Sequence, residues 1–232
     1  MKKSTFFLLI LAICFGYSAH SQDTLRLFGN KRTPAASKRS ENTTPRYNSD
    51  IKTLTGPGQK VGFYVGFHSE YSQIDGHDAF GAGGSIALVA NHSLAIGFAG
   101  KGFFSEPYSS AAGTDLKYNY SGGYGGFLIE PILFPKSPVH VSFPILLGAG
   151  GIAKSSWYNY NYPYEYTQIE IDDAEAFLVA EPGVELEFNI ARWMRLGLGA
   201  SYRFTSDLDQ ASFDSDIMNG FTGGFSLKFG KF

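Results

Sequence analysis

The chain has 232 residues, a formal net charge of −2, 28 glycines and 16% aromatic residues. A balanced charge does not indicate a nucleic-acid partner, and abundant glycine and aromatic residues with little charge are typical of strands and turns rather than helices. The single cysteine, Cys14, lies in the first segment. Disulfides, thiolate catalysis and cysteine-based zinc sites are therefore excluded for the rest of the chain.

Residues 1–21 have the features of a secretory signal peptide. A basic start is followed by a short apolar run and by Ala19-His20-Ser21, a small-x-small cleavage site before Gln22. A lipoprotein anchored through Cys14 is the alternative, but the bulky Ile13 stands where such sites need a small residue. The sequence predicts a secreted chain whose mature part begins at Gln22.

Residues 22–59 differ in composition from everything that follows. Eight Lys and Arg side chains, counted through Lys60, stand against three acidic ones, and no periodic apolar pattern is present. Such a composition cannot bury enough apolar surface to fold alone. We interpret this segment as a flexible basic tail, either a solvated spacer or a segment that touches anionic lipid or cell wall.

From residue 60 to residue 232, apolar and small or polar residues alternate along the chain. Val61 and Phe63 share one face of a strand, for example, and Gly62 and Tyr64 share the other. No segment after the signal peptide is apolar for the 18 or so residues that a transmembrane helix needs. The alternating segments are 61–68, 80–88, 94–101, 124–133, 139–147, 178–188, 194–204 and 219–232.

The connections between these segments alternate in length. Tight turns are expected at residues 91–92, 135–138 and 189–192, and longer polar loops at Ser105–Asp115, Trp157–Asp173 and Thr205–Asn219. The sequence therefore predicts an all-β fold, an eight-stranded antiparallel up-and-down transmembrane β-barrel over residues 60–232, with periplasmic turns and extracellular loops. A barrel of eight strands is filled by its own side chains, so an open channel is not expected.

Three segments resemble the small eight-stranded outer-membrane β-barrels of the OmpA and OmpX type in Gram-negative bacteria. They read EPILFPKSPVHVSFPILLGAGG (130–151), EPGVELEFNIARWMRLGLGASYRF (181–204) and GFSLKFGKF (224–232). The resemblance implies a β-barrel in the cell outer membrane, inserted by the barrel-assembly machinery. Phe232 departs from the usual closing strand, because it is out of phase with Phe225, Leu227 and Phe229.

Charged residues recur on the small and polar face of the predicted strands, which would line the lumen. Isolated buried charges are costly, so we expect them to pair and to rigidify the barrel; a gated or ion-selective lumen is the alternative. The predicted lumen network consists of Lys101, Glu130, Glu181, Glu185, Glu187, Arg195, Arg203 and Lys228.

No catalytic residue, metal site or cofactor is predicted. The histidines have no metal-ligand spacing. His77-Asp78 with Ser69 or Ser72 is a weak candidate for a hydrolase triad, which is recognised by geometry rather than by sequence. We therefore expect the protein not to be an enzyme.

The segment Trp157–Asp173 is the best candidate for a binding surface. Tyrosine and tryptophan give a large contact area at a low entropic cost, which suits protein or glycan recognition; an aromatic girdle is the alternative, with Trp193 and Phe134 on the periplasmic side. The predicted binding residues are Trp157, Tyr158, Tyr160, Tyr162, Tyr164 and Tyr166. Acidic residues of the last loop, for example Asp207 and Asp214, are candidates for divalent cations that bridge lipopolysaccharide.

These features favour a structural or surface-interaction (adhesin-like) protein that acts through its extracellular loops. The expected partners are outer-membrane lipid and lipopolysaccharide, and an extracellular protein or glycan. The alternatives are a narrow pore or small-ligand conduit, a loop-borne enzyme, and a soluble lipocalin-like barrel, which would need its apolar faces turned inward.

Overall fold

The structure is a computed structural model that describes residues 61–109, 116–160, 166–208 and 213–232, and it describes no side chain between 158 and 169. The predicted signal peptide (1–21) and basic tail (22–59) lie outside the described residues. By its contacts the chain divides into two units, 1–49 and 50–232, and only the second is described here. Within the described ranges, no helix is long and apolar enough to cross a membrane.

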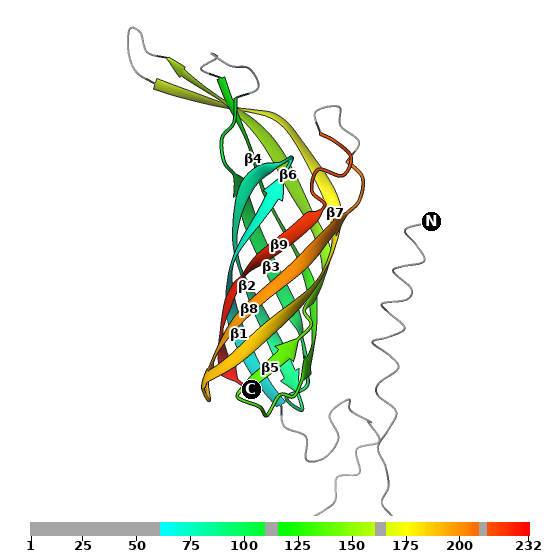
Figure 1. Cartoon of the computed structure of the whole chain (residues 1–232). Coiled ribbons are helices and arrows are strands. Elements are labelled where there is room, and N and C mark those ends of the chain that lie inside the picture. The colour runs from blue at the N-terminus through cyan, green and yellow to red at the C-terminus, as the bar shows by residue number, and fades with distance from the viewer. Residues whose placement is uncertain (1–60, 110–115, 161–165, 209–212) are drawn as a thin grey trace, which may run out of the picture. The chain divides into compact units, whose positions relative to one another are not determined.

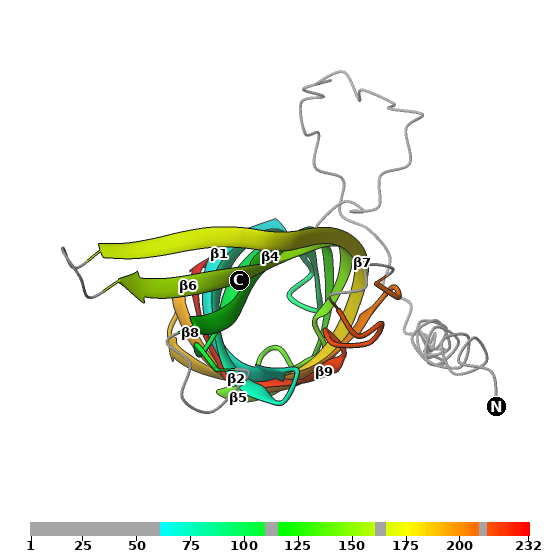
Figure 2. The same cartoon turned by 90° about the horizontal axis from the view of Figure 1, so that it is seen from above.

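The described residues form one antiparallel sheet that closes on itself (Figures 1 and 2). The strands are β1 (Val61–Ile74), β2 (His77–Ala90), β3 (Leu94–Ser105), β4 (Leu116–Leu133), β5 (Val139–Ser142), β6 (Ile145–Tyr160), β7 (Tyr166–Ala191), β8 (Met194–Thr205) and β9 (Gly220–Lys231). From β1 to β4 and from β6 to β9, each strand pairs with the next one along the chain, and the ring closes where β1 pairs with β9.

The predicted fifth strand, 139–147, is divided into β5 and β6. The break falls at Phe143 and Pro144, where proline has no N–H to donate to the sheet. Both pieces pair with β4 and β7, so together they fill one of eight positions around the ring. Backbone hydrogen bonds on either side, from Phe143 to Pro131 (2.9 Å) and from Gly183 to Pro144 (2.8 Å), keep the break in register.

Apolar side chains cover the outside of the ring, and small, polar and charged side chains lie inside it. Phe63, Leu88 and Leu178 are 57%, 64% and 67% exposed, whereas Tyr64, on the opposite face of β1 from Phe63, is 2% exposed. This arrangement is that of a transmembrane β-barrel, whose outer solvent is lipid. It contradicts the lipocalin-like alternative, which required an apolar interior.

Tight turns close one end of the barrel, as predicted. Asn91 and His92 both have positive φ (54° and 62°), and Arg192 and Trp193 alone separate the paired residues Ala191 and Met194. We call this the turn end, and the opposite end, where β1 and β2 are joined, the loop end.

The prediction of a loop over Trp157–Asp173 is wrong. β6 continues to Tyr160 and β7 begins at Tyr166, and the two strands form a hairpin that projects beyond the ring at the loop end (Figures 1 and 2). The segment is polar, which suggested a loop, but its tyrosines occupy every second position. That spacing and the β propensity of tyrosine favour a strand.

The described residues of the connection between β8 and β9 pack onto the inner face of the barrel wall at the loop end. Their apolar side chains are buried against Ile74, Phe103, Tyr120 and Phe177 on the inner face of the wall. We call these buried apolar side chains of the connection the plug. The plug consists of Leu208, Phe213, Ile217 and Met218.

Candidate functional site

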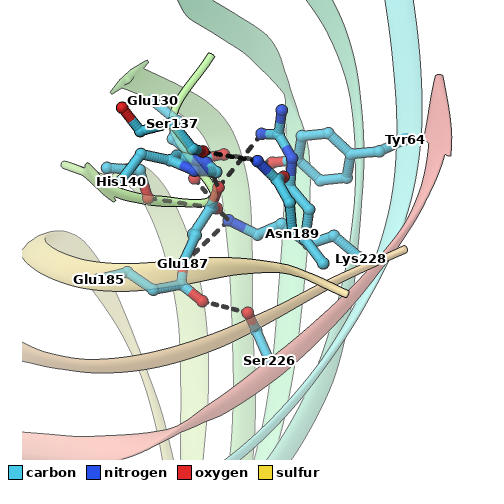
Figure 3. Close-up of polar contacts among 11 residues, drawn as sticks. Tyr64, Glu130, Ser137, His140, Glu185, Glu187, Asn189, Ser226 and Lys228 are labelled. Atoms are coloured by element: carbon cyan, nitrogen blue, oxygen red, sulfur yellow. Dashed lines mark hydrogen bonds and ion pairs between the residues drawn. The ribbon is translucent and has the colours of Figure 1, made fainter. Parts of the chain in front are cut away.

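Near the turn end, the ammonium group of Lys228 lies at the centre of a group of buried polar side chains in the lumen. β9 places this side chain inward, and its Nζ atom lies 2.5 Å from Glu130, 2.9 Å from Glu185 and 2.5 Å from Glu187 (Figure 3). The three glutamates come from β4 and β7, so one cation joins three distant strands.

Further polar groups complete this turn-end cluster. His140 Nε2 lies 2.5 Å from Glu187, and Arg195 donates to the same carboxylate at 3.2 Å. The Tyr64 hydroxyl donates to Glu130 at 2.5 Å, and the Ser226 hydroxyl donates to Glu185. Each buried carboxylate thus has at least one donor besides Lys228, which offsets the cost of its burial. We define the turn-end cluster as Tyr64, Glu130, His140, Glu185, Glu187, Arg195, Ser226 and Lys228.

Among the described residues, Glu130, Glu185 and Glu187 are the acidic groups close enough together to hold a metal ion, with ligand atoms within 4.8 Å of one another. The Lys228 ammonium contacts all three carboxylates. The chain therefore supplies its own cation at this position, and a metal ion would have to displace it.

A second cluster lies in the middle of the lumen. Lys101 Nζ contacts Glu70 at 2.7 Å and Glu181 at 2.8 Å, and Glu181 also accepts hydrogen bonds from the hydroxyls of Tyr124 (2.7 Å) and Ser201 (2.5 Å). Glu70 was not among the predicted lumen residues, although it has the same parity along β1 as Tyr64 and could have been identified from that spacing. These residues form the mid-lumen cluster.

Arg203 differs from the expectation that every lumen charge has a partner of opposite sign. Its Nε donates to the backbone carbonyl of Met218 at 2.6 Å, and its guanidinium lies 5.8 Å and 5.7 Å from the ring centres of Phe103 and Tyr124. Arg203 therefore fixes the plug to the wall. The other predicted lumen charges lie in the two clusters.

A cavity of about 100 Å³ separates the clusters. His68, Lys101, Glu181 and Lys228 are among its lining residues, and His68 Nε2 is 2.9 Å from the Ser85 hydroxyl. A polar cavity of this size has room for a few water molecules. Residues of both clusters, among them Glu70 and Glu130, also line it.

The Phe232 ring lies against inward-facing side chains at the turn end. It stacks on Tyr64, with 6.0 Å between ring centres, and the Arg195 guanidinium lies 3.8 Å from the ring centre. Phe229 points outward, whereas Phe232, which follows the end of β9 at Lys231, points inward. This explains why Phe232 is out of phase with the outward apolar residues of the closing strand.

The predicted aromatic binding residues belong to the projecting hairpin, as far as they can be placed. The Trp157 indole donates to Asn119 on β4 at 2.9 Å. Tyr158, Tyr160 and Tyr166 lie on β6 and β7, but their side chains are not described, and Tyr162 and Tyr164 lie outside the described residues.

The candidate triad is not assembled. The His77 ring stacks on Tyr108, with 3.9 Å between ring centres, and Asp78 accepts hydrogen bonds from Tyr71 (2.6 Å) and Gln73 (3.2 Å). Within the described part of the chain, no side-chain hydrogen bond joins His77 to Ser69 or Ser72. The exposed Asp207 and Asp214 do not form a metal-binding group with other described acidic residues.

No protein-family model and no curated protein matches the sequence. The structure is similar to those of small outer-membrane β-barrels. Ail, the attachment invasion locus protein of Yersinia pestis, is 14% identical, with 75% of this chain and 98% of Ail covered at a TM-score of 0.39. Neisserial surface protein A is 13% identical (75% and 99% covered, TM-score 0.40). A major outer membrane protein from Thermus thermophilus is 14% identical (74% and 99%, TM-score 0.43).

Proposed function

We propose that this protein is a sealed outer-membrane β-barrel that anchors a surface-interaction element, the hairpin of β6 and β7. One observation carries the proposal: buried side chains of the turn-end cluster, the mid-lumen cluster and the plug occupy the lumen, whereas the hairpin continues beyond the ring (Figure 1). A sealed barrel serves as an anchor and not as a passage. The proposed role is non-enzymatic.

The placement in a membrane rests on the outer surface of the barrel. Its apolar belt is bordered by exposed aromatic side chains at both ends, with Phe134 and Trp193 at the turn end and Tyr71, Phe80 and Phe104 toward the loop end. Aromatic girdles of this kind mark the two interfaces of a transmembrane barrel. Lipid and lipopolysaccharide would contact the belt, and the barrel-assembly machinery would insert the chain.

The hairpin offers an unpaired sheet edge for recognition. Pairing of β8 with β7 ends at Val179 and Thr205. One residue further, the Ser206 N–H donates to the Leu178 carbonyl at 3.0 Å, and the Leu178 N–H donates to the Ser206 hydroxyl at 3.1 Å. Alternation along the strand turns the backbone N–H and C=O of Ala176 toward the same side, where no strand of the described residues lies. Such an edge can bind an extended segment of another protein by β-strand addition.

The charge of this edge indicates the kind of segment that it would bind. Four acidic residues, Glu170, Asp172, Asp173 and Glu175, lie within six positions of β7 beyond the ring, and one lysine, Lys154 of β6, is paired with Asp173. An extended segment with basic side chains would be attracted, whereas two copies of the same edge would bring like charges together. We therefore favour a basic segment of a different protein over self-association.

Two measurements test the proposal. The protein should be found in the outer-membrane fraction, and its electrophoretic mobility should change on boiling, as expected for a folded barrel. In planar lipid bilayers it should show no single-channel conductance. A stable conductance that shifts in Arg195→Ala or Glu185→Ala would favour the narrow-pore alternative instead, and a soluble protein without a mobility shift would contradict the membrane placement.

A further inference from the structure

A hollow of about 630 Å³ lies at the loop end of the seam between β1 and β9. Pairing of the two strands ends at Ser72 and Thr222, although β1 continues to Ile74 and β9 begins at Gly220. The volume is in the range of small-molecule sites.

Aromatic side chains flank the hollow, and small residues form its floor. Tyr71 and Phe221 are 43% and 77% exposed, and Gly223 and Ala200 lie next to each other in the register of β9 and β8. Phe221 is held edge-on against Tyr202, with 4.8 Å between ring centres. Exposed aromatic faces beside a flat floor suit a ring-shaped ligand that stacks through its C–H groups.

Polar groups around the hollow retain hydrogen-bonding capacity. In the described part of the chain, Gln73 uses its amide nitrogen and Asn219 its amide oxygen, while Asp75 accepts from Tyr120 at 3.0 Å through one of its two oxygens. A ligand rich in hydroxyl groups can both donate to and accept from this set.

The charge of the residues that line the hollow disfavours an anionic ligand. Of the residues that the structure describes, no lysine, arginine or histidine lines the hollow, and the one charged lining residue is Asp75. A phosphate or sulfate would meet a carboxylate without a compensating cation. The chemistry instead fits a neutral sugar ring.

We propose that this seam hollow binds the neutral sugar headgroup of a membrane glycolipid. The source is a lipid because the hollow opens at the edge of the apolar belt, with Leu198 and Phe225, 53% and 51% exposed, on the outer face immediately below its floor. Those side chains would contact the acyl chains. The inference uses the membrane placement proposed above and is independent of the hairpin.

The test uses the full barrel in phosphatidylcholine nanodiscs, with and without glucosyl diacylglycerol, followed by NMR shifts of backbone amides. An added Cβ at Gly223 would meet only the Gly199 carbonyl oxygen, at 4.0 Å, so Gly223→Leu fills the floor without a backbone clash. Gly100→Leu is the matched control on another part of the outer wall, where the added Cβ would meet only the Tyr124 carbonyl oxygen, at 3.9 Å.

We expect glucosyl diacylglycerol to shift amides around the seam, Gly223→Leu to weaken binding at least about tenfold, and Gly100→Leu to bind normally. Equal binding of free methyl glucoside would overturn the membrane source, and preferential binding of phosphatidylglycerol would overturn the ligand class. Equal binding by the Gly223 and Gly100 variants would overturn the site. The boiling test of each variant separates these results from a failure of the proposed membrane placement.

Discussion

The charge of Lys228 is shared among three carboxylates that are distant in sequence. The partners Glu130 and Lys228 are 98 positions apart. Most inward residues could be identified from sequence, because successive side chains of a strand point to opposite faces of the sheet. Which inward residues contact one another depends on the register between strands, and the sequence of a single strand does not determine that register. The sequence therefore predicted eight inward charged residues, but it did not predict Glu70 as a further member or the division into two clusters.

Replacement of Lys228 by methionine is expected to destabilise the barrel strongly. The substitution keeps a side chain of similar length but leaves Glu130, Glu185 and Glu187 facing one another, with Arg195 as the nearest remaining charged donor. Breaking a buried ion pair in this way costs about 3–5 kcal/mol. The free energy of unfolding can be measured by urea titration in detergent micelles, with the boiling-dependent mobility shift as readout.

Lys231→Met is the matched control for this prediction. Lys231 is on the same strand but exposed, so its replacement should change the free energy of unfolding by less than about 0.5 kcal/mol. Similar effects of the two substitutions would contradict the central role assigned to Lys228.

Phe232 is expected to contribute to stability from inside the barrel. Phe232→Ala removes the stack on Tyr64 and the cation–π contact with Arg195, and it should lower the free energy of unfolding by about 2 kcal/mol. The same urea titration measures this change. Phe134→Ala, which removes the 73% exposed aromatic ring of a turn, should have a smaller effect in lipid-free detergent. The reverse order would contradict the inward position of Phe232.

At the scale of elements, the strands followed their period-2 pattern and the deviations have local causes. Pro144 divides one predicted strand because it lacks an N–H. The loop prediction for the segment from Trp157 to Asp173 was wrong because its polarity indicates a loop, whereas the spacing of its tyrosines favours a strand. Beyond the ring, an exposed hairpin needs no apolar face, so its polar composition is compatible with a strand.

The free edge of β7 predicts the behaviour of substitutions at Ala176. The N–H of Ala174 is already bonded to the Asp173 carboxylate at 3.2 Å, whereas that of Ala176 faces the unpaired side. Ala176→Pro removes this donor and should weaken an added strand while the pairing with β6 persists. Binding of a synthetic peptide of alternating valine and lysine, followed by fluorescence anisotropy, should fall several-fold.

Ala176→Val keeps the N–H and is the control, so it should bind the peptide as the unaltered protein does. High salt should weaken binding in both proteins, because acidic side chains provide part of the attraction. Binding that is indifferent to Ala176→Pro would show that the peptide attaches elsewhere and would contradict strand addition at this edge.

At the scale of the whole barrel, different kinds of side chain occupy the two ends of the lumen. At the turn end these are charged groups, whose inward positions the alternation along the strands predicted, together with Phe232. At the loop end they are four apolar residues from the described part of the connection between β8 and β9, which could not be predicted because they follow no period in a polar segment. The position of the plug residues is determined by their contacts with the surrounding barrel wall, which are tertiary contacts that no local sequence pattern predicts.

Loosening the plug should expose the lumen to solvent from the loop end only. Because Cys14 is the only cysteine of the chain, a Ser201→Cys variant reports access to the cavity beside Glu181. Its reaction with a charged thiol reagent should be slow, and should accelerate at least about tenfold when Met218→Gly removes part of the plug. Ser206→Cys at the exposed rim should react rapidly in both backgrounds. Conductance should stay absent, because the turn-end cluster still blocks passage; fast labelling with the plug intact would contradict a sealed mouth.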